Sequence, residues 1–246
     1  MIKNFELAKQ VAEEYKIPLA LLCAVIEKES NGHHVYGHDA DGVHSTRGRT
    51  VIVDGLVYGA GANVPVTSRN FAEFERRVLA GEKSNGVGIM QITFAGAVRA
   101  DGTRDGGYFR VAREKGFDLS KELDNIRMGA DIIKAHFQRA GGIPSKDAVV
   151  YVGTKYNGRF TYGEDLWVKF QEWEKTLAEQ AERAEQPSNV DNIEQVDYDE
   201  IVKLTSKFEE LSTKVDALSA ALEVFGKQAT ETAELLDALR SNLHKV

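Results

Sequence analysis

The sequence contains almost no cysteine and no long apolar run. Its 246 residues include a single cysteine, Cys23, so the chain cannot form an internal disulfide. This fits synthesis in a reducing compartment. Because Cys23 lies inside an apolar segment, we expect a buried structural thiol and not a nucleophile. No apolar run approaches the length of a membrane-spanning helix, so we expect no membrane insertion.

Positive charge is the minority charge. Lys and Arg number 31 against 38 Asp and Glu, a formal net charge of -7, which argues against nucleic acid or an anionic membrane as the main partner. The segment from Met1 to Gln10 has no apolar signal-peptide core, so we expect cytoplasmic synthesis without a signal peptide. A substrate beyond the membrane would then require another protein to release this one.

Three parts follow one another along the chain. We expect a folded body over residues 1–178, a polar linker over 179–198 and a regular helix over 199–246. The body is predicted to be mainly α, with one small β element. A Gly-rich loop from Asn31 to Gly61 is predicted to contain a hairpin that turns at Asp54-Gly55. Apolar spacing and capping residues predict helices at about 4–16, 18–30, 69–80, 94–100, 107–115, 120–140, 146–155 and from Tyr162 onward. Ser68 or Thr67 is the predicted cap of the helix at 69–80, and Ser145 is that of the helix at 146–155.

The C-terminal part has the most regular pattern. From Ile201 to Val246, apolar residues recur in alternating steps of three and four over more than six heptads. This pattern predicts a long coiled-coil helix and a homo-oligomer formed through residues 199–246. The alternative is that the apolar stripe packs on the body of the same chain.

The segment from Leu19 to Asn31 contains the main catalytic candidate. Leu19, Leu22, Val25 and Ile26 form one apolar stripe at helical spacing, and Glu29 continues it. A carboxyl group at the end of such a stripe is partly desolvated, which raises its pKa and suits it to act as a general acid. The alternative is that Glu29 caps the helix end or pairs with a neighbour.

Four short motifs occur in a fixed order. They are Ile26-Glu27-Lys28-Glu29-Ser30, Gly88-Ile89-Met90-Gln91-Ile92-Thr93, Asn125-Ile126-Arg127-Met128-Gly129 and Lys155-Tyr156-Asn157-Gly158. In this order they resemble the soluble lytic transglycosylase and goose-type lysozyme superfamily. Two further segments, Tyr36-Gly37-His38-Asp39 and Ser84-Asn85-Gly86-Val87-Gly88, make the sequence look most like endolysins of bacteriophages that infect actinobacteria. The resemblance covers residues 18 to about 175.

The resemblance implies a lysozyme-like catalytic domain. Such a domain would cleave the β-1,4 bond between N-acetylmuramic acid and N-acetylglucosamine in peptidoglycan, which makes glycan strands the expected partner. It implies no cofactor and no metal. Glu29 matches the acid that protonates the glycosidic oxygen. The matched substrate-binding positions are Ser30, Met90, Gln91, Tyr156 and Asn157, whereas Asn125 and Gly129 match structural positions.

Two departures from the family pattern affect the expected reaction. The segment between Glu29 and Met90 is longer than in simple transglycosylases, and Asn157-Gly158 lacks an intervening alanine. The longer segment adds the carboxylates Asp39, Asp41 and Asp54. A transglycosylase works with one acid, but an inverting hydrolase needs a second carboxylate about 6.5–9.5 Å away. Asp39 is the first candidate and Asp41 the second, unless these aspartates serve only as turn residues.

Two further interpretations stay open. His33, His34, His38 and His44 suggest a zinc-dependent amidase, but their one pair at helical spacing lies in a predicted loop and no cysteine joins them. The other is a sugar-binding or virion structural module without catalysis. Tyr36, Tyr58, Tyr108 and Tyr162 are candidates for stacking on sugars, although most aromatic residues serve the core.

Overall fold

The computed structural model describes residues 2–185, 206–207, 210 and 214–215. The chain divides into two units, Met1–Glu185 and Gln186–Val246. In the second unit the described residues are helical, and Lys214 Nζ lies 2.7 Å from Glu210 Oε1. Nearly all of the predicted coiled coil falls outside the described residues, so the homo-oligomer stays a prediction.

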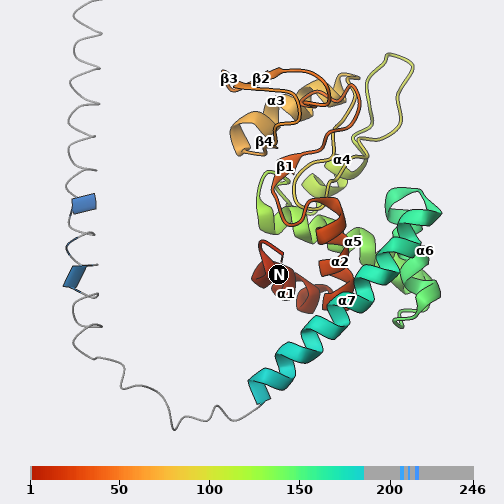
Figure 1. Cartoon of the computed structure of the whole chain (residues 1–246). Helices are drawn as coiled ribbons and strands as arrows, with labels where there is room; N and C mark the ends of the chain where they lie inside the picture. The colour runs from red at the N-terminus through yellow and green to blue at the C-terminus, as the bar shows by residue number, and fades with distance from the viewer. Residues whose placement is uncertain (1, 186–205, 208–209, 211–213, 216–246) are drawn as a thin grey trace, which may run out of the picture. The chain divides into compact units, whose positions relative to one another are not determined.

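The first unit is mainly helical, as the sequence predicted (Figure 1). Its strands form two small antiparallel pairs, β1 with β4 and β2 with β3. In chain order the elements are α1 (Phe5–Tyr15), α2 (Leu19–Glu29), β1 (Val35–Tyr36), β2 (Val51–Val53), β3 (Leu56–Tyr58), β4 (Val64–Pro65), α3 (Ser68–Leu79), α4 (Gly107–Glu114), α5 (Glu122–Arg139), α6 (Lys146–Asn157) and α7 (Phe160–Glu185).

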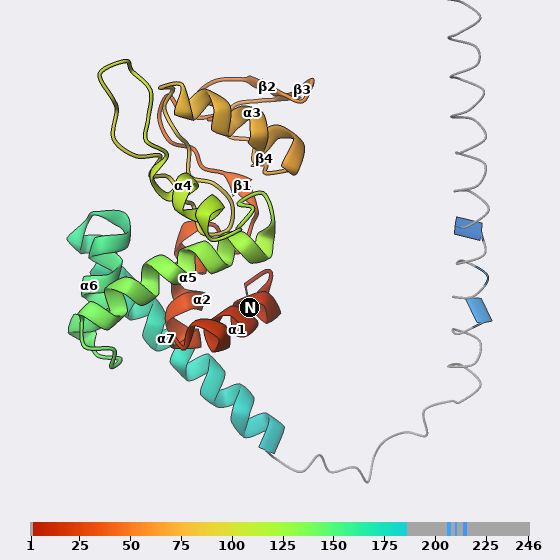
Figure 2. The ribbon, with the colours of Figure 1, turned by 180° about the vertical axis from the view of Figure 1, so that it is seen from behind.

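Helix α2 lies in the middle of this unit. It packs against α1 and α7, and every residue from Ala20 to Ile26 is buried (Figures 1 and 2). The helix is therefore covered on all sides, whereas the sequence predicted one buried stripe. Cys23 is completely buried, and burial raises the pKa of its thiol to about 12, which confirms a structural thiol.

Several local predictions are confirmed by the backbone. The Thr67 hydroxyl accepts a hydrogen bond from the Asn70 N–H at the start of α3, and the Ser145 hydroxyl accepts one from the Ala148 N–H at the start of α6. The β2–β3 hairpin turns at Asp54 and Gly55, whose φ angles are 52° and 79°. Two positive φ angles are the signature of the tight turn that the sequence predicted there.

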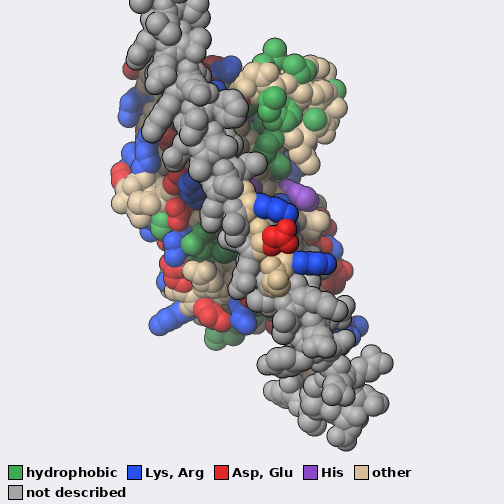
Figure 3. All heavy atoms as spheres, turned by 90° about the vertical axis from the view of Figure 1, so that its left-hand side faces the viewer, with side chains coloured by type: hydrophobic (Ala, Val, Ile, Leu, Met, Phe, Trp, Pro, Cys, Tyr) green, Lys and Arg blue, Asp and Glu red, His purple; other side chains and the backbone are tan. Residues whose placement is uncertain are grey.

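The β2–β3 hairpin contributes little to the core. Ile52 and Val57 form a cross-strand pair, and both are exposed, as is Leu56. Figure 3 views the molecule from the left-hand side of Figure 1. It shows hydrophobic side chains on the upper part of that side, at the height of the hairpin in Figure 1. Of the six strand residues in the hairpin, Val53 alone is buried.

None of the described helices is both long and apolar enough to cross a membrane.

One predicted helix does not form, and the last helix extends beyond the predicted end of the body. The helix expected at 94–100 is irregular chain, in which Val98 forms an isolated bridge with Arg104. Gly96, at φ 93°, interrupts it, and a Cβ atom there would lie within 1.6 Å of Asp105 Oδ1. Helix α7 continues to Glu185, past the predicted end of the body at residue 178.

Helices α6 and α7 touch at two glycines. A Cβ atom on Gly163 would lie 2.3 Å from the carbonyl oxygen of Val150, and one on Gly153 would lie 2.8 Å from the Cα atom of Gly163. Only residues without a side chain permit the two backbones to approach so closely. This crossing fixes the position of Tyr162, which precedes Gly163 on the first turn of α7.

The segment from Val87 to Ile92 is a closed loop anchored by one buried side chain. Val87 and Ile92 exchange two backbone hydrogen bonds of 3.1 Å. Asn125 Oδ1 accepts the Met90 N–H at 2.8 Å, and its amide nitrogen donates to the Val87 carbonyl at 3.0 Å. Gly129 leaves room for the Met90 side chain, which a Cβ atom there would meet at 2.4 Å. The predicted structural roles of Asn125 and Gly129 are confirmed.

Replacing Asn125 with alanine is expected to destabilise the protein by about 3 kcal/mol, because a buried N–H and a buried carbonyl lose their partners. Urea unfolding measures the change. The matched control is Gln138→Ala on the exposed side of the same helix, which is expected to unfold like the wild type. Equal midpoints for the two variants would contradict the anchoring role.

Candidate active site

Glu29 is the last residue of α2 and faces a cavity of about 330 Å³. The fully buried part of the helix ends at Ile26, so Glu29 lies where the helix leaves the core. Asn157, at the end of α6, and Tyr162, at the start of α7, line the same cavity. The structure therefore brings together Glu29 and Asn157, two of the residues that the sequence selected.

The environment of Glu29 favours a protonated carboxyl group. Burial raises its pKa above the ordinary value. A hydrogen bond of 2.5 Å from the Tyr162 hydroxyl to Oε1 and the charge of Lys28 lower it, while the charge of Asp39 raises it. The net effect is a raised pKa, which is what a general acid needs near neutral pH. Burial also raises the pKa of Tyr162, so its phenol keeps the proton that it donates.

The ammonium group of Lys28 pairs with Asp165 and not with Glu29. Its ammonium nitrogen lies 3.2 Å from Asp165 Oδ2 and 4.8 Å from the centre of the Tyr162 ring. The positive charge of Lys28 is therefore paired with the carboxylate of Asp165 at the rim of the cavity. This arrangement leaves the carboxyl group of Glu29 with a neutral hydrogen-bond donor, Tyr162, as its direct partner.

Glu27, two residues earlier, has the opposite environment. Its Oε2 accepts a hydrogen bond of 2.7 Å from the indole N–H of Trp173, and its Oε1 lies 2.9 Å from Lys169 Nζ. Although burial raises the pKa of Glu27, the hydrogen bonds from Lys169 and Trp173 outweigh it and the pKa is lowered. Glu27 is thus an ionised residue that ties α2 to α7, and Glu29 is the candidate acid.

Ser30, Met90 and Tyr156 meet around the Val87–Ile92 segment. Ser30 Oγ donates to the Ile89 carbonyl at 2.7 Å, and the Tyr156 hydroxyl donates to the Met90 carbonyl at 2.6 Å. The Met90 side chain is completely buried. The predicted substrate contact of Met90 is therefore not available to its side chain, because that side chain packs on α5. Ser30, through its bond to Ile89, holds the Val87–Ile92 segment against the end of α2.

Gln91 is partly exposed and rigidly held. Its amide nitrogen donates to the Gly88 carbonyl at 2.8 Å and to the Val35 carbonyl at 3.1 Å. A Cβ atom on either Gly37 or Gly86 would lie 2.3 Å from Gln91 Oε1. Two glycines therefore make room for this amide, and its oxygen keeps one orientation.

Gln91 and Tyr156 line a second, smaller cavity of about 120 Å³, together with Phe94 and Tyr108. Phe94 is 55% exposed and meets Tyr108 edge to face, with ring centres 5.5 Å apart. Burial raises the pKa of Tyr156, and the Glu29 carboxylate raises it further. An exposed aromatic ring beside a fixed amide is suited to bind a sugar ring.

Of the three candidate second carboxylates, Asp39 has the best position. Its Oδ2 accepts the Gly86 N–H at 2.7 Å, beside the glycines that surround Gln91. Asp41 lies 3.7 Å from Lys83 and Asp54 lies 3.6 Å from Arg69. Asp39 is the one whose charge contributes to the raised pKa of Glu29.

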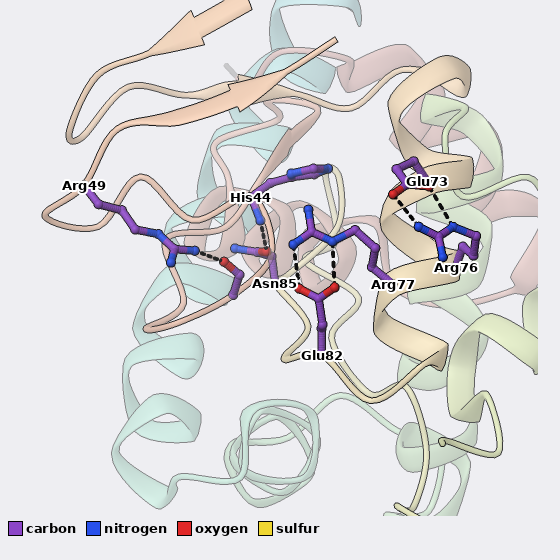
Figure 4. A network of polar contacts seen from close by, with 8 residues as sticks. His44, Arg49, Glu73, Arg76, Arg77, Glu82 and Asn85 are labelled. Carbon is purple, nitrogen blue, oxygen red and sulfur yellow. Dashed lines mark hydrogen bonds and ion pairs between the residues drawn. The ribbon is translucent and has the colours of Figure 1, made fainter. Parts of the chain in front are cut away.

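The histidines have separate partners. His34 Nε2 bonds the Ser120 carbonyl, His38 bonds Asn63 and Thr46, and His33 is exposed. His44 is buried, and burial lowers its pKa to about 4. Figure 4 shows it in a polar network with Asn85, which accepts the His44 backbone N–H at 2.9 Å. Among the described residues, no three His, Cys, Asp or Glu side chains gather as metal ligands.

Sequence reasoning did not find the Tyr162–Glu29 contact or the exposed Phe94. The sequence predicts only sugar stacking for Tyr162, and it predicts a helix around Phe94 that does not form. Gly158 ends α6 at φ 83°, and α7 begins two residues later at Phe160. Tyr36, another stacking candidate, is buried and donates to Asn70 Oδ1 at 2.9 Å.

No protein-family profile, curated protein or solved structure matches the chain.

The two glutamates are expected to respond oppositely to neutralisation. A raised folded-state pKa means that Glu29 stabilises the fold below its unfolded pKa and loses that contribution as the pH rises through its folded pKa. Glu29→Gln is therefore expected to raise the free energy of unfolding at pH 7, and to change it little at about pH 4. Chemical denaturation at the two pH values measures this.

Glu27→Gln is the matched control. A lowered folded-state pKa stabilises the fold above the unfolded pKa, and this contribution is lost as the pH falls through the folded pKa. Glu27→Gln should thus destabilise the protein at pH 7. Equal destabilisation by both substitutions would show that Glu29 is an ordinary paired carboxylate.

Proposed function

We propose that this protein is a bacteriophage endolysin that cleaves the β-1,4 bond between N-acetylmuramic acid and N-acetylglucosamine of peptidoglycan. It would act on the host cell wall after release from the cytoplasm. The observation that carries the proposal is the carboxyl group of Glu29, which lines an open cavity with a pKa raised by burial. The order of the four motifs supports the same substrate.

Tyr162 determines which oxygen of Glu29 gives up the proton. Oε1 accepts the Tyr162 hydroxyl, so the acidic proton belongs on Oε2. Oε2 then protonates the departing glycosidic oxygen, and Glu29 becomes a carboxylate. The hydrogen bond from Tyr162 favours that charged form, and it strengthens as the proton leaves.

Two endings of the reaction are compatible with these residues. In a lytic transglycosylase, the 6-hydroxyl group of the muramic acid attacks its own anomeric carbon and closes an anhydro ring, while the Glu29 carboxylate takes the proton of that hydroxyl group. In an inverting hydrolase, a second carboxylate takes a proton from water, and the water attacks the same carbon. Asp39 is the proposed second carboxylate, because its charge acts on Glu29 and its side chain lies beside Gln91.

Glu29→Gln is expected to lower the rate of lysis of purified peptidoglycan by a factor of about 10³, because general acid catalysis contributes about 10²–10⁴. The measurement is loss of turbidity. Glu13→Gln on the exposed side of α1 is the matched control and should keep full activity. Retained activity in Glu29→Gln would refute the catalytic role, and intact strands with the wild type would favour a non-catalytic sugar-binding module.

Asp39→Asn separates the two endings. If Asp39 activates water, the wild type leaves reducing ends and the variant is nearly inactive. If the sugar closes its own ring, the wild type leaves anhydro-muramic ends and the variant remains active. Mass spectrometry of the digested glycan identifies the ends. Asp41→Asn serves as the control, because Asp41 pairs with Lys83 on the surface.

A further inference from the structure

A separate cavity of about 320 Å³ lies between α3, α4 and residues 117–120. Figure 2 shows α3 and α4 as neighbours in the same part of the unit. None of its lining residues lines the two cavities near Glu29. Its volume is at the lower end of the range of small-ligand sites. The proposed function assigns no role to this cavity.

The walls of this cavity are aromatic and aliphatic. Phe71 comes from α3, Phe109 and Ala112 from α4, and Phe117 and Leu119 from the segment after α4. All except Phe117 are buried. Such walls favour an apolar body. The faces of phenylalanine rings also attract a cation at close range.

The polar groups of the cavity carry an excess of negative charge. Glu75 lies on α3 with its side chain only 17% exposed, and it forms an ion pair with Arg113 at 3.4 Å. Asp118 Oδ1 accepts a hydrogen bond of 2.6 Å from the Ser120 hydroxyl, which in turn lies 2.9 Å from the Ser68 hydroxyl. Two carboxylates and one arginine thus line the cavity.

The charge of Arg113 only partly offsets the cost of burying the Glu75 carboxylate. Burial raises the pKa of Glu75, the charge of Arg113 lowers it and the charge of Asp118 raises it, with a net increase. Arg113 is itself more than half exposed, so solvent screens its charge. A second cation in the cavity would offset the desolvation of Glu75, whereas an anion would face two carboxylates.

We propose that this cavity binds a short alkylammonium ion, with its apolar chain against the phenylalanine walls and its ammonium group at Glu75 and Asp118. A primary ammonium group has three N–H donors. The two carboxylates and the Ser68 hydroxyl supply acceptors on the polar side of the cavity. The same chemistry occurs in free aliphatic amines and in lysine side chains.

Calorimetric titration of the full chain tests the proposal. The probes are n-hexylammonium, N-acetyl-lysinamide and hexan-1-ol, which has the apolar chain without the charge. We expect at least one amine to bind about fivefold more tightly than the alcohol, as for a partly screened ion pair. The tighter of the two amines identifies the source of the ligand. Equal affinity for the alcohol and both amines would overturn the proposal.

Two substitutions are expected to act in opposite directions. Glu75→Gln should weaken amine binding about fivefold and leave hexan-1-ol unchanged, while Arg113→Gln should strengthen amine binding because it removes the competing cation. The controls are Glu73→Gln and Arg110→Gln. In the wild type, Glu73 pairs with Arg76 on the exposed side of α3 (Figure 4), and Arg110 pairs with Glu114.

Thermal unfolding verifies that each variant is folded before titration. If folded Glu75→Gln and Arg113→Gln both bind the amines like the wild type, the assignment of the ammonium group is wrong. Binding is measured directly, so the result does not depend on whether the protein cleaves peptidoglycan.

Discussion

The buried amide of Asn125 is the interaction on which the arrangement of the site depends. It holds the Val87–Ile92 segment against α5 by bonding the backbone at both Val87 and Met90. The carbonyl groups of that segment then become fixed acceptors for side chains from two other helices. Ser30 reaches Ile89 from the end of α2, and Tyr156 reaches Met90 from α6. One side chain thus sets the relative positions of three helices at the point where the candidate acid lies.

The environment of a carboxyl group, more than its place in the sequence, decides its chemistry here. Glu27 and Glu29 belong to the same short helix, yet only Glu27 has an ionic partner and an indole donor. The difference arises because α2 is covered on all sides until it leaves the core. Glu27 meets α7 at Trp173 and Lys169, whereas Glu29 reaches the edge of a cavity.

Local features of the sequence predicted most of the fold, and contacts between distant residues supplied the rest. Helical spacing located α1, α2 and α5, and Thr67 and Ser145 marked the starts of α3 and α6. The prediction of a helix at 94–100 was wrong, because apolar spacing carries no information about the close contact between Gly96 and Asp105. The Tyr162–Glu29 bond joins residues 133 positions apart and requires the glycine crossing of α6 and α7, which no local pattern encodes. Burial of Met90 is likewise a property of packing, whereas Glu29 and Asn157 were found from motifs.

The solitary, deeply buried Cys23 makes this chain a convenient host for chemical labelling. Its thiol is inaccessible, and burial keeps it in the unreactive protonated form. A cysteine introduced at an exposed position would therefore be modified selectively without first removing the natural one. Thr161, exposed at the rim of the Glu29 cavity, is one such position. A fluorophore attached there would report directly on whether that cavity is occupied.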